Sequence, residues 1–256
     1  MVYLYSKCFL GTHFKNQGSD KMIRYSRIFE KNPREIVLLK SRPCKWGRCF
    51  FCDYILDNCE DGASIIEFNR EVLKDVTGEF KKLEVINSAS VFELPKESLQ
   101  NIKDIVLGKG IEELYFEVHY SYRDRLDEIR NYFSGVNVKF KCGIETFDDD
   151  FRNKYLKKGV IFNSPEEVAK SFNTICLLVG VKGQTKEMII RDIDILLKHF
   201  ERGCINIYVD NTTPVKADPE LIFWFRNNYS YLEDMKNIEI LWNNTDFGVG
   251  EDDEDK

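Results

Sequence analysis

The sequence of 256 residues predicts an α/β protein in which parallel strands form a barrel or a partial barrel. Two observations carry this prediction. Short apolar runs typical of strands alternate with amphipathic segments of helical period, in six or seven successive units. No linker rich in Pro, Gly or Ser divides these units, which favours one barrel domain. We expect this domain over residues 35–250, after an N-terminal extension over 1–34 and before a disordered acidic tail over 251–256.

In the first half of the chain, apolar runs predict strands over 35–41, 82–89, 113–120 and 136–143. The helical spacing of the apolar residues between them predicts helices over 64–80, 95–110, 121–135 and 148–159. Gly108 or Gly110 is expected to end the second of these helices, because glycine tolerates the left-handed backbone common at helix ends. Ser121 is expected to cap the third, because its hydroxyl can accept from a free N–H group.

In the second half of the chain, strands are expected over 173–180, 204–210 and 238–244, and helices over 186–200 and 218–229. Ile189, Ile193 and Leu196 fall on one face of the first of these helices, as a helix packed on a sheet requires. The isolated cysteines Cys176 and Cys204 lie in apolar runs and are predicted to be core residues. In parallel barrels the chemistry sits at the C-terminal ends of the strands, so functional residues are expected directly after each strand.

Composition limits the classes of function. Hydrophobic residues make up 43% and charged residues 31%, and no apolar run approaches the roughly 18 residues of a membrane span. The N-terminal segment lacks the pattern of a secretory signal, so a cytoplasmic protein is predicted. The net charge is −6, and no block of Lys and Arg is present that would neutralise a phosphate backbone. Membrane and nucleic-acid partners are therefore not expected.

Three of the eight cysteines, Cys44, Cys49 and Cys52, fall within nine residues directly after the first strand. Their spacing is C-x4-C-x2-C. Lys45 and Arg48 lie between them, which indicates an exposed loop and not a chance grouping of core thiols. The loop therefore predicts a metal centre.

Three centres are compatible with this loop. A structural zinc ion would need Cys59 as the fourth ligand, although zinc loops normally bring two closer pairs of ligands. A plant-type [2Fe–2S] centre has the same literal spacing, but it belongs to small domains without a long series of βα units. A [4Fe–4S] cluster held by three cysteines would leave one iron open to an external ligand.

The cysteine loop at the end of the first strand resembles the signature of the radical SAM superfamily, whose usual spacing is C-x3-C-x2-C. The stretch CGIETFDDDFRNKYLKKGV (142–160) resembles the fourth-strand motif of the elongator-like and archaeosine-synthase-like subgroup. The stretch LLVGVKGQT (177–185) resembles the fifth-strand motif of the same subgroup. The resemblance runs in order over about residues 35–215. It implies a partial (β/α)6 TIM-like radical SAM barrel with short terminal extensions.

The resemblance implies two cofactors, a [4Fe–4S] cluster and S-adenosyl-L-methionine (SAM). Cys44, Cys49 and Cys52 would hold the cluster, and its open iron would chelate SAM, which accounts for the missing fourth ligand. The bound cofactors would generate a 5′-deoxyadenosyl radical. The residues that the resemblance assigns to SAM are Phe51 and Val181 beside the adenine, Asn87, Ser88 and Ser90 near the amino group, Glu145 at the ribose, and Arg152 or Lys158 at the carboxylate.

Polar residues at the other strand ends are the candidates for substrate binding. They are Glu117, Asn206, Asp210, Asn243 and Asp246, with Trp46 and Tyr54 in and beside the cysteine loop. A carboxylate among them can accept the paired N–H groups of a guanine-like edge or neutralise an amine, which suits a deazaguanine with an alkylamine arm.

The candidate catalytic residues are Lys45, Glu117 and His119. Lys45 flanks the cysteines and is placed to relay a proton, although it could equally be a solvated loop charge. A lone histidine is more often structural than catalytic, but His119 falls at a predicted strand end.

Within the superfamily the chain most resembles the queuine lyases of bacterial queuosine salvage. This resemblance implies a lyase that cleaves the small molecule queuine, or a related deazaguanine, to the base preQ1. It also implies an electron donor such as flavodoxin or ferredoxin. The alternative enzyme is a tRNA-modifying radical SAM protein of the archaeosine-synthase or thiotransferase type, and the alternative outside catalysis is a zinc-stabilised binding module.

Overall fold

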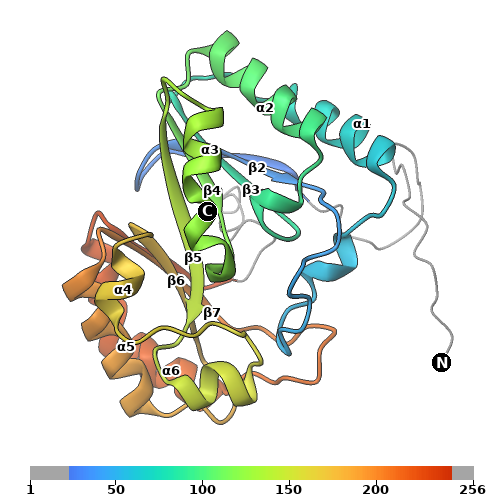
Figure 1. Ribbon diagram of the computed structural model, residues 1–256. Helices are drawn as coiled ribbons and strands as arrows, with labels where there is room; N and C mark the ends of the chain where they lie inside the picture. Colours follow the sequence, from blue (N-terminus) through green and yellow to red (C-terminus); the bar gives the residue numbers. More distant parts are fainter. Residues whose placement is uncertain (1–22, 244–256) are drawn as a thin grey trace, which may run out of the picture.

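Seven parallel strands, β2 to β8, curl into an open half-barrel in the computed structural model, which describes residues 23–243 (Figure 1). The strands lie side by side in chain order, which confirms the predicted partial barrel. An eighth strand, β1, pairs antiparallel with β2 at one edge. The strands are β1 (Tyr25–Ile28), β2 (Arg34–Leu39), β3 (Lys82–Asn87), β4 (Glu113–Glu117), β5 (Asn137–Glu145), β6 (Thr174–Val179), β7 (Arg202–Ile207) and β8 (Ile238–Leu241).

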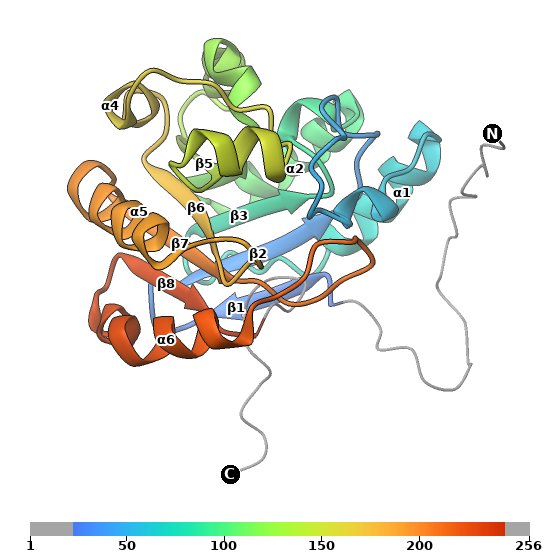
Figure 2. The same cartoon turned by 90° about the horizontal axis from the view of Figure 1, so that it is seen from below.

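Helices cover the outer face of the curled sheet (Figures 1 and 2). They are α1 (Gly62–Leu73), α2 (Lys96–Lys109), α3 (Leu126–Tyr132), α4 (Pro165–Ala169), α5 (Lys186–His199) and α6 (Pro219–Tyr229). The main hydrophobic core lies between these helices and the sheet, and includes the fully buried Leu83, Leu114 and Phe116 of β3 and β4. No helix within the described residues is long and apolar enough to cross a membrane.

The expected helix over 64–80 is shorter in the structure, because the chain after Leu73 binds a buried carboxylate. The Glu35 side chain accepts hydrogen bonds from the backbone N–H groups of Thr77, at 2.6 Å, and Gly78, at 2.7 Å. Gly78 has a φ of +80°, which a helix excludes. Gly110, also with a positive φ, ends α2 as expected.

The structure differs from the expected local structure in four further places. Ser121 does not cap the third expected helix. His119 is the N-cap instead, and its side chain accepts from the Ser121 N–H at the start of a 3₁₀ turn. The expected helix over 148–159 is one π-helical turn, Phe151–Tyr155. Helix α4 was not expected, because its five residues are too few to display a helical period. Strand β1 was not expected either, and it lies within the predicted extension over 1–34.

Charged side chains fill the N-terminal end of the barrel interior and join its first and last parallel strands, β2 and β8. Arg34 of β2 pairs with Glu84 of β3 and, at 2.9 Å, with Glu239 of β8. Lys141 of β5 pairs with Glu84 at 2.5 Å, and Arg202 of β7 pairs with Glu239 at 2.8 Å. Burial alone would raise the pKa of Glu84, but the charges of Lys141 and Arg34 outweigh it and lower the pKa to about 2. This layer forms the polar floor under the opposite, C-terminal end of the barrel.

Candidate active site

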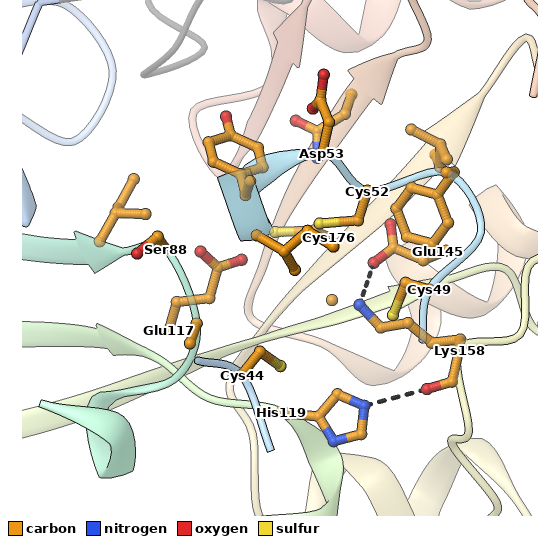
Figure 3. Close-up of a pocket in the computed structure, with 18 of the residues that line it drawn as sticks. Cys44, Cys49, Cys52, Asp53, Ser88, Glu117, His119, Glu145, Lys158 and Cys176 are labelled. Carbon is orange, nitrogen blue, oxygen red and sulfur yellow. Dashed lines mark hydrogen bonds and ion pairs between the residues drawn. The ribbon is translucent and has the colours of Figure 1, made fainter. Parts of the chain in front are cut away.

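A pocket opens at the C-terminal ends of the strands, between the loop that follows β2 and the ends of β3 to β8. It contains residues that the sequence analysis assigned to all three groups, namely cluster, cofactor and substrate (Figure 3). The predicted residues that line it are Cys44, Cys49, Phe51, Cys52, Tyr54, Asn87, Ser88, Glu117, His119, Glu145, Lys158 and Asn206. These residues lie at the C-terminal ends of the strands, where functional residues of a parallel barrel are expected.

The segment 156–159 holds the cysteine loop over the pocket. The Phe50 N–H donates to the Leu156 carbonyl at 2.8 Å, and the indole N–H of Trp46 donates to the Lys157 carbonyl at 2.8 Å. The Trp46 ring lies against Gly159, where a Cβ atom would come within 2.1 Å of the ring. Gly159 also has a φ of +67°, so both its conformation and its contact favour glycine.

His119 connects the cysteine loop to the strand ends. Its ring stacks on Trp46, with 6.1 Å between ring centroids and 14° between planes. Its Nδ1 lies 3.3 Å from the Ser121 N–H, which it accepts, so Nε2 carries the proton and donates to the Lys158 carbonyl at 3.1 Å. Burial and the charge of Lys158 lower the pKa of His119 to about 4, so the imidazole is neutral at pH 7. His119 is thus held by three neighbours at the pocket wall.

The three cysteines all line the pocket, and Figure 3 shows them around the Lys158 side chain. Burial raises the pKa of the Cys49 thiol, and that of Cys52 to about 12, whereas the nearby charge of Lys158 acts in the opposite direction. The Gly47 N–H points at the Cys44 sulfur, at 3.4 Å. A bound metal centre would therefore stabilise the thiolates of Cys49 and Cys52, which burial disfavours.

The donor set fits a cluster with an open iron better than a zinc ion. Three thiols from one loop reach one pocket, whereas Cys59 is 2% exposed and does not line it. Among residues 23–243, no three Cys, His, Asp or Glu side chains already stand close enough to hold a metal ion, so the thiols would have to close around a bound group. Cys59, the fourth ligand that a tetrahedral zinc site on this loop would use, lies outside the pocket lining.

An ion pair lies beside the cysteines, at the end of β5. The Lys158 ammonium is 2.6 Å from the Glu145 carboxylate and lies over the Phe51 ring, 5.5 Å from its centroid. Burial alone would lower the pKa of Lys158, but the charges of Glu145 and Cys49 outweigh it and raise the pKa. Glu145 has a φ of +68° after a bulge in β5, a conformation that costs a non-glycine residue about 1–2 kcal/mol.

Gly143 makes room for this ion pair. A Cβ atom at residue 143 would come within 2.6 Å of the Glu145 carboxylate oxygen and 2.9 Å of the Lys158 nitrogen. The side chains of Glu145 and Lys158 therefore meet over a position that only glycine can occupy. A strained carboxylate paired with a buried ammonium is typical of a site that binds a polar ligand.

The end of β3 supplies a buried acceptor without a partner. Asn87 donates from its side-chain nitrogen to the Ser90 carbonyl at 3.0 Å, and its Oδ1 has no partner among the described residues. Ser88 lies beside it in the pocket wall and bonds to Ser41. Asn87 lines the pocket, and its orphaned acceptor suits an N–H group of a ligand. Ser90 is buried and lies outside the lining.

The side of the pocket away from Lys158 carries one unpaired carboxylate. Glu117, at the end of β4, forms no hydrogen bond or ion pair that the described part of the chain provides, and burial raises its pKa. Lys141 and Asn206 line the same region, and Cys176 and Cys204 form part of its floor. The cysteine pair was expected in the core, and it is buried, but it also faces the pocket.

Other predicted residues lie outside the pocket lining. The Lys45 ammonium lies over the Tyr122 ring, 5.4 Å from its centroid. The Trp46 ring packs against Gly159 and His119. The buried Arg152 guanidinium binds the carbonyls of Thr146 and Val160, both at 2.9 Å, so it holds its own loop together.

The remaining predictions fall on the last strands of the barrel. Val181 is buried and pairs with Ala217 in an isolated bridge. The Asp210 carboxylate accepts from the Ala217 N–H at 2.7 Å, away from the pocket. Asn243 is exposed at the end of the described chain, and Asp246 lies outside the described residues.

Several lining residues were not predicted from the sequence, and Lys141 is the most informative of them. It lies two residues before Gly143 on β5, and Cys176 and Cys204 are cross-strand partners on β6 and β7. Every second residue of a barrel strand points inward, so the inward set could have been extended back from each strand end. A lysine within an apolar strand was the available signal for a buried charge pair.

The chain is similar to two known proteins, one of which has a solved structure. No protein-family model matches the chain. The chain is 50% identical to a queuine lyase from Clostridium spiroforme, in a structure bound to SAM and queuine, with a TM-score of 0.87 over 90% of this chain and 100% of that chain. It is 28% identical over 236 residues, 80% of this chain, to an uncharacterised protein of Methanocaldococcus jannaschii, and it spans 62% of that protein's length.

Proposed function

The chain belongs to the queuine lyase family of radical SAM enzymes, and from this premise we propose that it cleaves free queuine to the deazaguanine base preQ1 in queuosine salvage. The observation that carries the proposal is the 50% identity to a queuine lyase bound to SAM and queuine, over the whole length of that chain. The pocket supports it, because cysteines, an ion pair and an unpaired carboxylate all line one cavity.

Cys44, Cys49 and Cys52 would hold a [4Fe–4S] cluster at this site. When bound, the cluster and SAM supply a radical that removes a hydrogen atom from the substrate. The chain itself supplies binding, orientation and the exclusion of water. The Lys158 ammonium lowers the cost of forming thiolates beside it, as the direction of its effect on Cys49 and Cys52 indicates.

The ion pair and the orphaned amide are proposed to bind SAM. Glu145, held in a left-handed conformation, would accept from ribose hydroxyls, and Lys158 would attract the SAM carboxylate. Asn87 Oδ1 would accept from the SAM amino group, which would satisfy a buried oxygen that lacks a partner. The Phe51 ring lines the same side and would pack on the adenine.

Glu117 is proposed to contact queuine. Of the carboxylates that line the pocket, Glu145 is paired with Lys158, and Asp53 lies 3.4 Å from the Thr212 N–H. Glu117 retains its full capacity to accept hydrogen bonds. The enzyme would act in the cytoplasm and would take electrons from a donor such as flavodoxin or ferredoxin.

SAM cleavage that depends on queuine tests the proposal. Anaerobically reconstituted protein is reduced and incubated with SAM, with and without free queuine, and 5′-deoxyadenosine is measured by mass spectrometry. We expect queuine to increase 5′-deoxyadenosine formation. A colourless protein that holds zinc but no iron or sulfide, or SAM cleavage that queuine does not alter, would contradict the proposal.

A further inference from the structure

We propose that Glu117 and Lys141 together recognise the pyrimidine edge of the substrate base, the Lys141 ammonium donating to the ring carbonyl and the Glu117 carboxylate accepting from the N–H groups beside it. This inference rests on the proposed function, because it names the part of the deazaguanine that each residue binds. It adds a specificity residue, Lys141, that was not among the candidates from the sequence.

The two residues are neighbours across a strand pair. Glu117 of β4 and Lys141 of β5 are register partners in the parallel sheet, so their backbones lie about 5 Å apart. Both side chains line the pocket. A carboxylate and an ammonium therefore stand side by side at the substrate end of the barrel.

Glu117 is the carboxylate that is free to accept from a ligand. It forms no ion pair with Lys141, whose ammonium instead lies 2.5 Å from Glu84, one layer deeper in the barrel. Glu84 also binds Arg34, so the deeper layer holds Lys141 in place from below. The two oxygens of Glu117 can accept two parallel N–H groups in one plane.

Lys141 keeps donor capacity toward the pocket. An ammonium has three N–H groups, and an ion pair with the single Glu84 oxygen leaves at least two of them for a ligand. Burial alone would lower the pKa of Lys141, but the charge of Glu84, with smaller effects from Cys176, Cys204 and Glu117, outweighs it and raises the pKa. The side chain is thus a fixed cation next to an acceptor-only carboxylate.

This arrangement matches one base edge and rejects another. A 2-amino-4-oxopyrimidine edge presents a carbonyl acceptor, a ring N–H and an amino group in sequence, which meets an ammonium followed by a carboxylate. A 4-aminopyrimidine edge presents a donor toward the ammonium and a ring nitrogen lone pair toward the carboxylate. Buried polar groups left unpaired in this way typically reduce binding by about 100-fold or more.

The test compares two bases that differ only at this edge. Binding of preQ1 and of its 7-aminomethyl-7-deazaadenine counterpart to the reconstituted protein with SAM is measured by titration calorimetry. The wild-type protein should prefer preQ1 by at least about 100-fold. Glu117→Gln and Lys141→Met should each reduce this preference by about 10-fold or more, and Lys141→Gln, which keeps a donor, should retain part of it.

Lys139, two residues before Lys141 on β5, offers a matched control. Lys139→Met removes the same charge from β5, but Lys139 pairs with Glu113 at 2.7 Å and does not line the pocket. The control should keep the wild-type preference, and unchanged SAM binding and melting temperature in Lys141→Gln would show that the fold is intact.

Two results would overturn the inference. Equal affinity of the wild-type protein for both bases, with queuine still cleaved, would remove the edge-recognition role and leave the proposed function standing. A protein that neither binds preQ1 nor converts queuine would refute the proposed function, and this inference with it.

Discussion

At the scale of single residues, the pocket depends on Gly143, which has no side chain. Gly143 leaves the space in which the Glu145 carboxylate and the Lys158 ammonium meet, 2.6 Å apart. The ion pair in turn faces Phe51 and the cysteines. One glycine therefore couples the strand end to the site where SAM is proposed to bind.

Gly143→Ala should weaken SAM binding by at least about 10-fold, because the added methyl group displaces Glu145 or Lys158. Equilibrium dialysis of SAM against the reconstituted variant measures this. Gly108→Ala is the control, since no atom lies within 4 Å of a Cβ atom at residue 108 on α2. Equal SAM affinity in both variants would show that the ion pair does not bind SAM.

His119 should stay neutral well below pH 6.5 in the folded protein. Its pKa of about 4 means that the unfolded chain binds more protons than the folded one between pH 4 and 6.5, so this residue removes stability as the pH falls through that window. An NMR titration of the apo-protein should show the Cε1–H signal of His119 unchanged from pH 8 to 5.5. The chain has three histidines, and His119→Gln assigns the signal. A midpoint near pH 6.5 would contradict the buried, hydrogen-bonded geometry.

At the scale of elements, the short segment 156–159 fastens the cysteine loop to the barrel. It contributes the carbonyls that bind Phe50 and Trp46, and Gly159 against which the Trp46 ring lies. The loop that follows β7 holds the other side, through a 2.8 Å hydrogen bond from Asn211 to the Phe51 carbonyl. The three cysteines thus lie on a loop that the segment 156–159 and the loop after β7 both support.

Trp46→Ala should loosen this loop and the metal centre that it carries. Loss of a hydrogen bond and of ring packing costs about 1–2 kcal/mol, which corresponds to roughly tenfold faster loss of iron to a chelator. Absorbance of the reconstituted protein in the presence of a chelator follows this loss. Trp224→Ala, on the outer helix α6, is the matched control and should release iron at the wild-type rate. Equal rates in both variants would mean that Trp46 does not support the loop.

The order of the elements could be predicted from the sequence, because apolar runs and helical periods survive without tertiary information. The positions of the cysteine loop and of Glu117 at strand ends followed from that order, whereas Glu145 was found through the family resemblance of residues 142–160. The carbonyl partners of Arg152 could not be predicted, since only the π-helical turn brings them to its guanidinium. Lys141 and Glu84 could not be paired either, because their contact depends on how far the sheet curls.

At the scale of the whole molecule, an ion-pair layer closes the N-terminal end of the half-barrel. Arg34 reaches from β2 to β8 and so links the first and last parallel strands across the interior. The same layer holds Lys141 under the substrate region. Stability of the barrel and shape of the pocket therefore share one network.

Arg34→Met should destabilise the protein by about 3–5 kcal/mol, because it leaves Glu84 and Glu239 short of a buried counter-charge. Urea denaturation at pH 7.5 measures the change. Lys74→Met, which breaks an exposed pair with Glu71 on the protein surface, should change stability by less than about 0.5 kcal/mol. The contribution of Glu84 is present above pH 4.5 and is lost as the pH falls towards 2, since its pKa is lowered in the folded state. Similar losses of stability in the two variants would show that the ion-pair layer does not hold β2 and β8 together.

Conversion of queuine to preQ1 tests the central claim most directly. Reduced, reconstituted protein is incubated anaerobically with SAM and free queuine, and preQ1 is quantified by mass spectrometry beside 5′-deoxyadenosine. Cys49→Ala, which removes one proposed cluster ligand, serves as the control. The account predicts preQ1 in the wild-type reaction and none in Cys49→Ala. Queuine recovered intact from a wild-type reaction in which the cluster is loaded and SAM is bound would contradict it.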